Sequence, residues 1–146
     1  NLECVIVDKN NKTYDSRDNC NAIIETGSDA LIAGCYATKI PNSVVEIGDN
    51  AFLGCSEMTT VHIPNSVRSI GFRSFANCFR IKELSLSDSL HFIHGEAFDG
   101  CSSLEEVNIP RNAGGKHLSI RSSRMRISSR YQSLIKNISW RKSLMM

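Results

Sequence analysis

The apolar residues of this chain recur at a fixed step of 23 residues. Such self-similarity is the sequence signature of a repeat protein, in which each unit buries its apolar side only by stacking on its neighbours. The step is kept by five columns: Ile47, Ile70 and Ile93; Phe52, Phe75 and Phe98; Cys55, Cys78 and Cys101; Met58, Ile81 and Leu104; and Val61, Leu84 and Val107.

Each repeat predicts the same short elements. Val61-His62-Ile63 alternates apolar with polar residues, which indicates a half-buried strand, and Pro64 ends it because proline cannot donate to a ladder. Residues 67–70 form a second extended piece, and residues 51–55 predict a short helical or 3-10 corner. We therefore predict a solenoid, mainly β with such corners, whose 23-residue coils stack parallel strands.

The repeated segment is similar to a known family. Its pattern Ile-Pro-Asn-Ser-Val-x-x-Ile-Gly-x-x-Ala-Phe-x-x-Cys-x-x-Leu resembles the BspA-like leucine-rich repeats, with residues 37–110 as regular repeats. Residues 14–26 also resemble the longer variant repeat of Bacteroides members. The resemblance implies a curved leucine-rich-repeat solenoid, usually exported to the cell surface or secreted, that binds host or bacterial proteins. It brings no catalytic residues.

Residues 1–36 are expected to form a partial repeat followed by the long variant repeat. Leu2, Val5 and Val7 have the spacing of Leu104, Val107 and Ile109, which predicts a first strand inside a coil. Solenoids need polar caps at their ends. We therefore expect upstream coils in the intact protein, and self-association through this uncapped end.

The extra length of the variant repeat predicts a β-hairpin. Residues 22–25 and 30–33 flank the turn-forming segment 26–29. Centring the turn on Gly27 and Ser28 pairs Cys20 with Cys35, which makes them a candidate disulfide. Two free thiols are the alternative.

The charges divide the chain in two. All acidic residues lie between Glu3 and Glu106, whereas the segment 111–146 has nine Lys or Arg and no Asp or Glu. This basic, Arg- and Ser-rich tail has three interpretations: a disordered or partly helical extension, a segment that docks on the acidic repeats, or the product of a frameshift. Only Tyr131 and Trp140 accompany its charges, too few for a stacking platform, so we expect no nucleic-acid partner.

Composition excludes some classes. The chain is 41% hydrophobic and 22% charged, which is typical of a globular protein. No apolar run approaches the ~20 residues of a transmembrane helix. No signal peptide is present in this chain, but it begins without Met, so this says nothing about export.

No pattern of catalytic or metal-binding residues emerges. The column of Cys55, Cys78 and Cys101 is interpreted as buried small residues, because a row does not converge on a tetrahedral zinc. His91 and His94 are expected on opposite faces of a strand. No nucleophile elbow and no His-Glu-x-x-His motif occurs. We expect no catalytic residue, metal or cofactor, and no enzyme.

What remains is a strand face. Polar residues between the buried columns are expected to project outward as a binding surface for a protein or glycan ligand. They are Lys39, Thr60, His62, Glu83, Ser85, Glu106 and Asn108. The alternative function is a structural spacer or stalk that displays another module.

Overall fold

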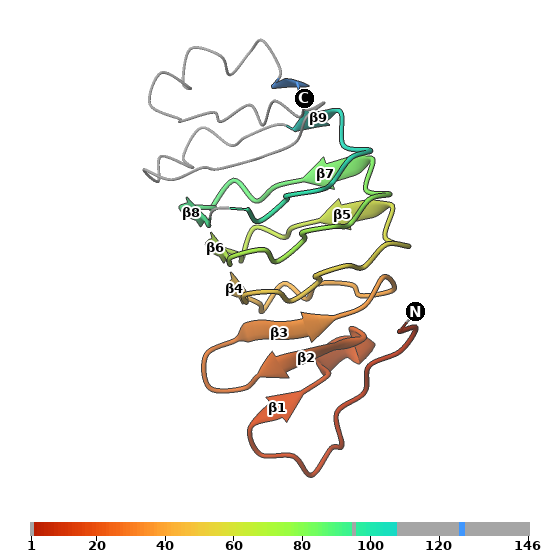
Figure 1. The fold of residues 1–146 in the computed structure, drawn as a ribbon. Coiled ribbons are helices and arrows are strands. Elements are labelled where there is room, and N and C mark those ends of the chain that lie inside the picture. The colour runs from red at the N-terminus through yellow and green to blue at the C-terminus, as the bar shows by residue number, and fades with distance from the viewer. Residues whose placement is uncertain (1, 95, 108–125, 128–146) are drawn as a thin grey trace.

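The computed structural model describes residues 2–94, 96–107 and 126–127, and short strands dominate them. Figure 1 shows the strands in layers that follow one another from the N-terminal to the C-terminal side. The elements are β1 Tyr14–Asp15, the 3-10 helix η1 Arg17–Asn19, β2 Ala22–Glu25, β3 Ala30–Gly34, β4 Glu46–Ile47, β5 Thr60–His62, β6 Ser69–Ile70, β7 Glu83–Ser85, β8 Phe92–Ile93, β9 Glu106–Val107 and β10 Arg126–Ile127.

One sheet of six strands, in the order β1-β2-β3-β4-β6-β8, runs along one side of the molecule. Its first three strands are antiparallel, and β3, β4, β6 and β8 are parallel. Ile47 pairs with Ile70, and Ile70 with Ile93, so equivalent residues of successive repeats are partners. The hairpin expected around residues 26–29 is formed by β2 and β3 and supplies the antiparallel part of this sheet.

Strands β5, β7 and β9 lie on the opposite side of the stack (Figure 1). β5 and β7 are parallel, with Val61 opposite Leu84. β9 pairs in parallel with β10, where Arg126 is the partner of Glu106. Apart from residues 126–127, the basic tail lies outside the described residues, and so do its competing interpretations.

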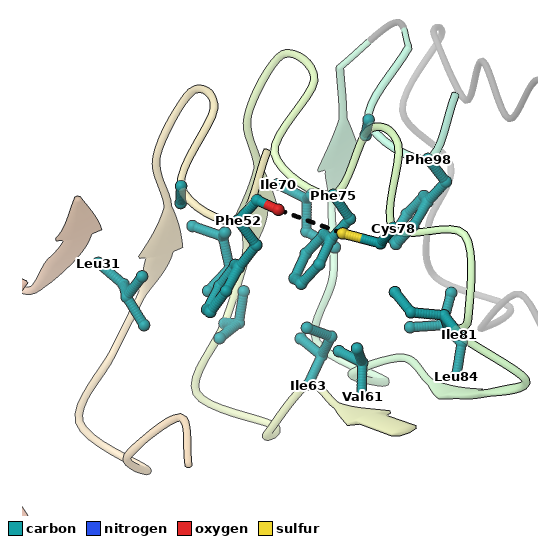
Figure 2. Close-up of a cluster of buried hydrophobic side chains, with 14 of the residues drawn as sticks. Leu31, Phe52, Val61, Ile63, Ile70, Phe75, Cys78, Ile81, Leu84 and Phe98 are labelled. Atoms are coloured by element: carbon teal, nitrogen blue, oxygen red, sulfur yellow. Dashed lines mark hydrogen bonds between the residues drawn. The ribbon is translucent and has the colours of Figure 1, made fainter. Parts of the chain in front are cut away.

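The core fills the space between these two sets of strands. The columns that the sequence places inward are buried, except that Cys55 is half-buried. The rings of Phe52 and Phe75 stack with centroids 4.8 Å apart, and those of Phe75 and Phe98 with centroids 5.2 Å apart (Figure 2). Apolar burial of this kind is the main favourable contribution to folding.

The corners are short turns, as the sequence predicts. Residues 50–54 form hydrogen-bonded turns in which an N–H donates to the carbonyl three residues earlier, without a regular helix. The Leu53 N–H donates to the Asn50 carbonyl at 3.1 Å, and the Cys55 N–H donates to the Phe52 carbonyl at 3.0 Å. Asn50 and Gly54 have positive φ values of 57° and 71°. Because a right-handed helix requires negative φ at successive residues, these two positions limit the corner to one turn.

The strand predicted at the beginning of the chain was wrong. Residues 2–7 have no regular secondary structure, and Leu2 and Ile6 are exposed. The Val7 N–H donates to Ser16 Oγ at 2.9 Å, and Cys4 Sγ lies 3.4 Å from Asn21 Oδ1. The Ser16 side chain therefore takes up the Val7 N–H, a backbone group that a strand ladder would have used.

Candidate binding surface

The polar residues predicted to project outward, here called the outward row, are Lys39, Thr60, His62, Glu83, Ser85, Glu106 and Asn108. This row is regular where β5 and β7 run side by side. In both strands the middle residue is buried and the two flanking residues are exposed, because successive side chains of a strand point to opposite faces. Thr60 lies opposite Glu83, and His62 lies opposite Ser85. His62 Nδ1 and Ser85 Oγ are 3.2 Å apart, so the two repeats also share a side-chain hydrogen bond on this face.

The other members of the predicted row are placed differently. Lys39 is exposed but belongs to no strand, and its N–H donates to the Cys20 carbonyl at 3.0 Å. Glu106 begins β9, whereas its side chain and all of Asn108 lie outside the described part of the chain. The structure therefore brings Thr60, His62, Glu83 and Ser85 together and leaves Lys39 on a separate segment.

A pocket separates Lys39 from β5. It has a volume of ≈ 440 Å³ and lies between residues 38–40 and 60–62. Its apolar lining comes from Ile40, Phe52, Met58, Val61 and Phe75, and its polar lining from Thr38, Lys39, Thr60 and His62. The sequence pattern does not predict this pocket. The signal available was the irregular spacing before Ile40, which is 33 residues from Val7 where a regular repeat has 23.

The candidate disulfide is not formed in this structure, and Cys20 and Cys35 are buried free thiols. Glu25 pairs with Ala30 in the expected register, but a bulge between Ile23 and Ile24 shifts the rest of the hairpin. Ala22 is therefore opposite Gly34, and Cys35 is out of register with Cys20 by one residue. A bulge adds one residue to one strand, and such a shift cannot be recognised from the spacing of cysteines alone.

The cysteine column connects consecutive corners. The Cys78 thiol donates to the Phe52 carbonyl at 3.1 Å (Figure 2), and the Cys101 thiol donates to the Phe75 carbonyl at 3.2 Å. Burial raises the pKa of both thiols to about 12. Cys4, in contrast, is exposed.

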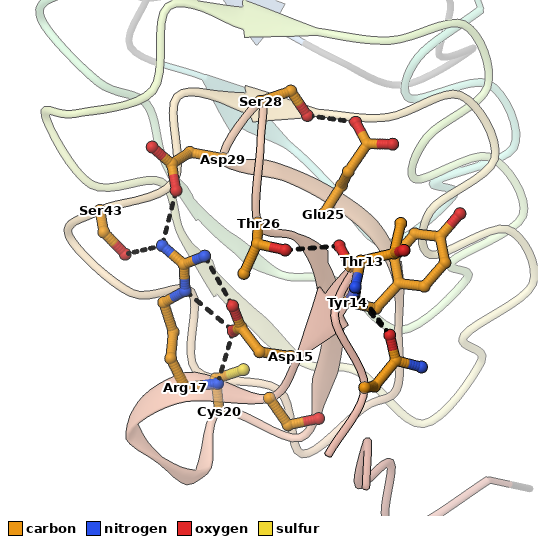
Figure 3. A network of polar contacts seen from close by, with 12 residues as sticks. Thr13, Tyr14, Asp15, Arg17, Cys20, Glu25, Thr26, Ser28, Asp29 and Ser43 are labelled. Atoms are coloured by element: carbon orange, nitrogen blue, oxygen red, sulfur yellow. Dashed lines mark hydrogen bonds and ion pairs between the residues drawn. The ribbon is translucent and has the colours of Figure 1, made fainter. Parts of the chain in front are cut away.

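A polar network that the sequence did not predict surrounds Arg17 (Figure 3). Its guanidinium contacts Asp15 at 2.7 Å, Asp29 at 2.6 Å and Ser43 Oγ at 3.4 Å. Hydrogen bonding to Arg17 lowers the pKa of Asp15, and the same pairing raises the pKa of Arg17. Because its partners are 2, 12 and 26 residues away in sequence, only the fold brings this network together.

Groups that would support catalysis or metal binding are dispersed. Among residues 2–94, 96–107 and 126–127, no three His, Cys, Asp or Glu side chains are arranged to hold a metal ion. His94 packs edge-on against Phe92, with ring centroids 4.4 Å apart.

Within the same ranges, no helix has the length and apolar character needed to cross a bilayer. The polar strand row and the neighbouring pocket between Lys39 and β5 form the candidate binding surface.

The strands, columns and corners define a protein of the leucine-rich-repeat class. Residues 33–139 match the family model described as BspA type Leucine rich repeat region (6 copies). The chain therefore belongs to the BspA-type leucine-rich-repeat family, whose repeats are of the kind used for protein interaction and are typically non-catalytic. A comparison with curated proteins found no match.

Solved structures with the same fold come from several bacteria. The pneumococcal vaccine antigen PcpA is 25% identical with a TM-score of 0.66, over 73% of this chain and 27% of that one. A leucine-rich repeat protein of Bacteroides capillosus is 20% identical with a TM-score of 0.54, over 88% of this chain and 94% of that one. A leucine rich cell surface protein of Faecalibacterium prausnitzii is 24% identical with a TM-score of 0.56, over 88% of this chain and 40% of that one. This chain thus spans about a quarter of the PcpA chain.

Proposed function

We propose that this chain is part of a leucine-rich-repeat solenoid that binds a partner protein, without catalysis, through the outward row of its strands. Residues 37–110 would supply the regular 23-residue coils, and residues 1–36 the variant repeat before them. One observation carries the proposal. Thr60 and His62 of one repeat lie in register with the different polar residues Glu83 and Ser85 of the next, whereas the residue between them is buried and apolar in both strands.

The mechanism follows from that arrangement. The side chains of the row stand on paired strands, so their positions are fixed before a partner arrives. Less conformational entropy is then lost on binding than for a flexible loop with the same residues. The His62–Ser85 contact holds two members of the row in place. A partner would be recognised by several such polar contacts at once.

We also propose that the protein acts at the cell surface or after secretion. Its family and its 25% identity to PcpA, which is described as a vaccine antigen, support this placement. A vaccine antigen must be accessible to antibodies, and an exported binding repeat would be accessible in the same way. Detection of the protein on intact cells with an antibody tests the placement, and labelling only after lysis would contradict it.

The binding test compares two faces of the same protein. The row variant replaces Thr60, His62, Glu83 and Ser85 with alanine. The control variant replaces exposed residues near the other sheet, Glu46, Arg68 and His91, with alanine. Each is applied to an array of extracellular proteins and glycans.

We expect the wild type and the control variant to capture the same protein ligand, and the row variant to lose it by about tenfold or more. A glycan captured in the same way would change the class of ligand. Equal capture by all three proteins, with equal thermal stability, would favour the alternative role of a spacer or stalk.

A further inference from the structure

β5 has an open edge. The Ile63 N–H donates to the Ser85 carbonyl at 2.8 Å, and the Thr59 carbonyl accepts from the Lys82 N–H at 2.9 Å. Residues 59 and 63 thus use their backbone groups toward β7. Because these groups alternate between the two edges of a strand, those of Thr60 and His62 point the other way. No described residue makes a hydrogen bond to them.

The segment that should pair with this edge is held elsewhere. Residues 37–39 lie one 23-residue step before residues 60–62 and are their equivalents in the preceding repeat. However, the Lys39 N–H donates to the Cys20 carbonyl at 3.0 Å, and Thr38 Oγ1 donates to the Asn21 carbonyl at 2.6 Å. The variant repeat therefore draws this segment away from β5, while β3, β4 and β6 stay paired on the opposite side.

The opening is the ≈ 440 Å³ pocket, a volume typical of ligand sites. Its floor is apolar, formed by Phe52, Met58 and Phe75. Lys39 belongs to its lining, and no Asp or Glu lines it. A strand placed here would direct one side chain into the apolar floor and the two flanking side chains outward, toward Lys39 and His62.

We propose that the open edge of β5 accepts an extended peptide from a partner protein, in which an apolar residue is flanked by acidic residues. The backbone groups of Thr60 and His62 bond to the peptide, its apolar side chain enters the pocket, and its carboxylates face Lys39. This is strand addition, in which backbone hydrogen bonds give affinity and pockets give specificity. The inference rests on the proposed function, because it names the partner chemistry of a protein-binding repeat.

The test uses a labelled peptide, acetyl-Gly-Glu-Ile-Glu-Val-Glu-Gly-amide, titrated with the full chain while fluorescence anisotropy is followed. We expect saturable binding. A peptide with alternate amides N-methylated cannot donate to the edge and should bind at least about tenfold more weakly, as should one with Lys in place of Glu. Equal binding of the N-methylated peptide, or no binding of the parent peptide, overturns the proposal.

Two variants locate the site. Lys39→Glu reverses the charge of this lining residue, and Lys82→Glu makes the same change at an exposed lysine away from the pocket. We expect Lys39→Glu to weaken the parent peptide about tenfold more than Lys82→Glu does. Both residues are exposed, so both variants should keep the wild-type melting temperature. An equal effect of the two substitutions contradicts the proposal.

Hydrogen exchange measured by NMR gives a direct readout at the backbone. The Thr60 and His62 amides should exchange more slowly when the peptide is bound, whereas the Ile63 amide, already bonded, should change little. Unchanged exchange at Thr60 and His62 overturns strand addition, and slowing in the absence of peptide as the protein concentration rises would assign the edge to a second copy instead. If the peptide fails while the row variant still loses its ligand, only this inference fails.

Discussion

Among the glycines that the structure describes, Gly34 has the least room for a side chain. A Cβ at this position would lie 2.1 Å from Cε1 of Phe52 and 2.8 Å from Thr38 Oγ1, distances that force the Phe52 ring to move. We expect Gly34→Ala to destabilise the chain by about 1–3 kcal/mol, as overpacked cores do. The measurement is urea unfolding. Gly27→Ala is the matched control, since nothing lies within 4 Å of that position, and an equal loss in both variants would refute the steric explanation.

The cysteines should differ sharply in reactivity. A thiol reacts as its thiolate, and a pKa raised to about 12 leaves almost no thiolate at Cys78 and Cys101 near pH 8. Cys4 is exposed. With iodoacetamide at pH 8, mass spectrometry should find Cys4 modified first, while Cys78 and Cys101 react only after denaturant is added. Early modification of the two buried thiols in the native protein would contradict their burial.

At the scale of elements, the sequence allowed the repeated strands to be predicted because their information is local. Alternation at residues 61–63 and the recurring columns fix which side chains are buried, and the structure buries them. Likewise, turn-forming residues at 26–29 located the hairpin. Alternation of this kind predicts which face of a strand is buried. It is sufficient to predict that Thr60 and His62 are exposed, as the structure has them.

The remaining features depend on contacts that no local pattern contains. The extra residue Ile32 in β3, opposite the step from Ile23 to Ile24, puts Cys20 and Cys35 out of register. Hydrogen bonds from residues 38–39 to residues 20–21 open the edge of β5 and create the pocket. Both the register shift and the open edge depend on which of several possible partners a backbone group bonds to. The sequence does not show which of these hydrogen bonds forms.

The Arg17 network ties β1, the hairpin turn and the first regular repeat together. In the folded chain this network lowers the pKa of Asp15. The network therefore stabilises the fold fully at pH values above the pKa of Asp15 in the unfolded chain, about 4. This stabilisation is lost as the pH falls through the lower pKa that Asp15 has in the folded chain. Arg17→Met should therefore cost about 1 kcal/mol at pH 7, a value reduced for partial solvent exposure.

The pH dependence of that cost separates charge from packing. The difference between wild type and Arg17→Met should shrink when denaturant unfolding is repeated at pH values well below 4, because Asp15 is then protonated in both folded and unfolded chains. Lys12→Met, at an exposed lysine, serves as the control. A difference that is constant from pH 7 to pH 2 would assign the effect of Arg17 to its aliphatic contacts instead.

On the scale of the whole molecule, the described strands pair with the equivalent strand of the next repeat, β4 with β6, β6 with β8 and β5 with β7. The rings of Phe52, Phe75 and Phe98 stack in order from repeat to repeat (Figure 2), and the thiols of Cys78 and Cys101 donate to carbonyls of the preceding corners. Interfaces between neighbours therefore supply the stability that a single repeat lacks. A destabilising substitution in the middle repeat should therefore weaken its interfaces with both the preceding and the following repeat.

Phe75 tests this coupling, because it contacts the aromatic rings of both neighbours and is 0% exposed. Phe75→Ala should cost about 3–5 kcal/mol, the range for a large side chain deleted from a core. Phe72→Ala changes the same residue type in the same repeat, but Phe72 is 42% exposed, so it should cost less than about 1 kcal/mol. Native-state hydrogen exchange should show faster opening in the strands on both sides of Phe75. Faster exchange confined to its own repeat would mean that the stack does not couple the repeats.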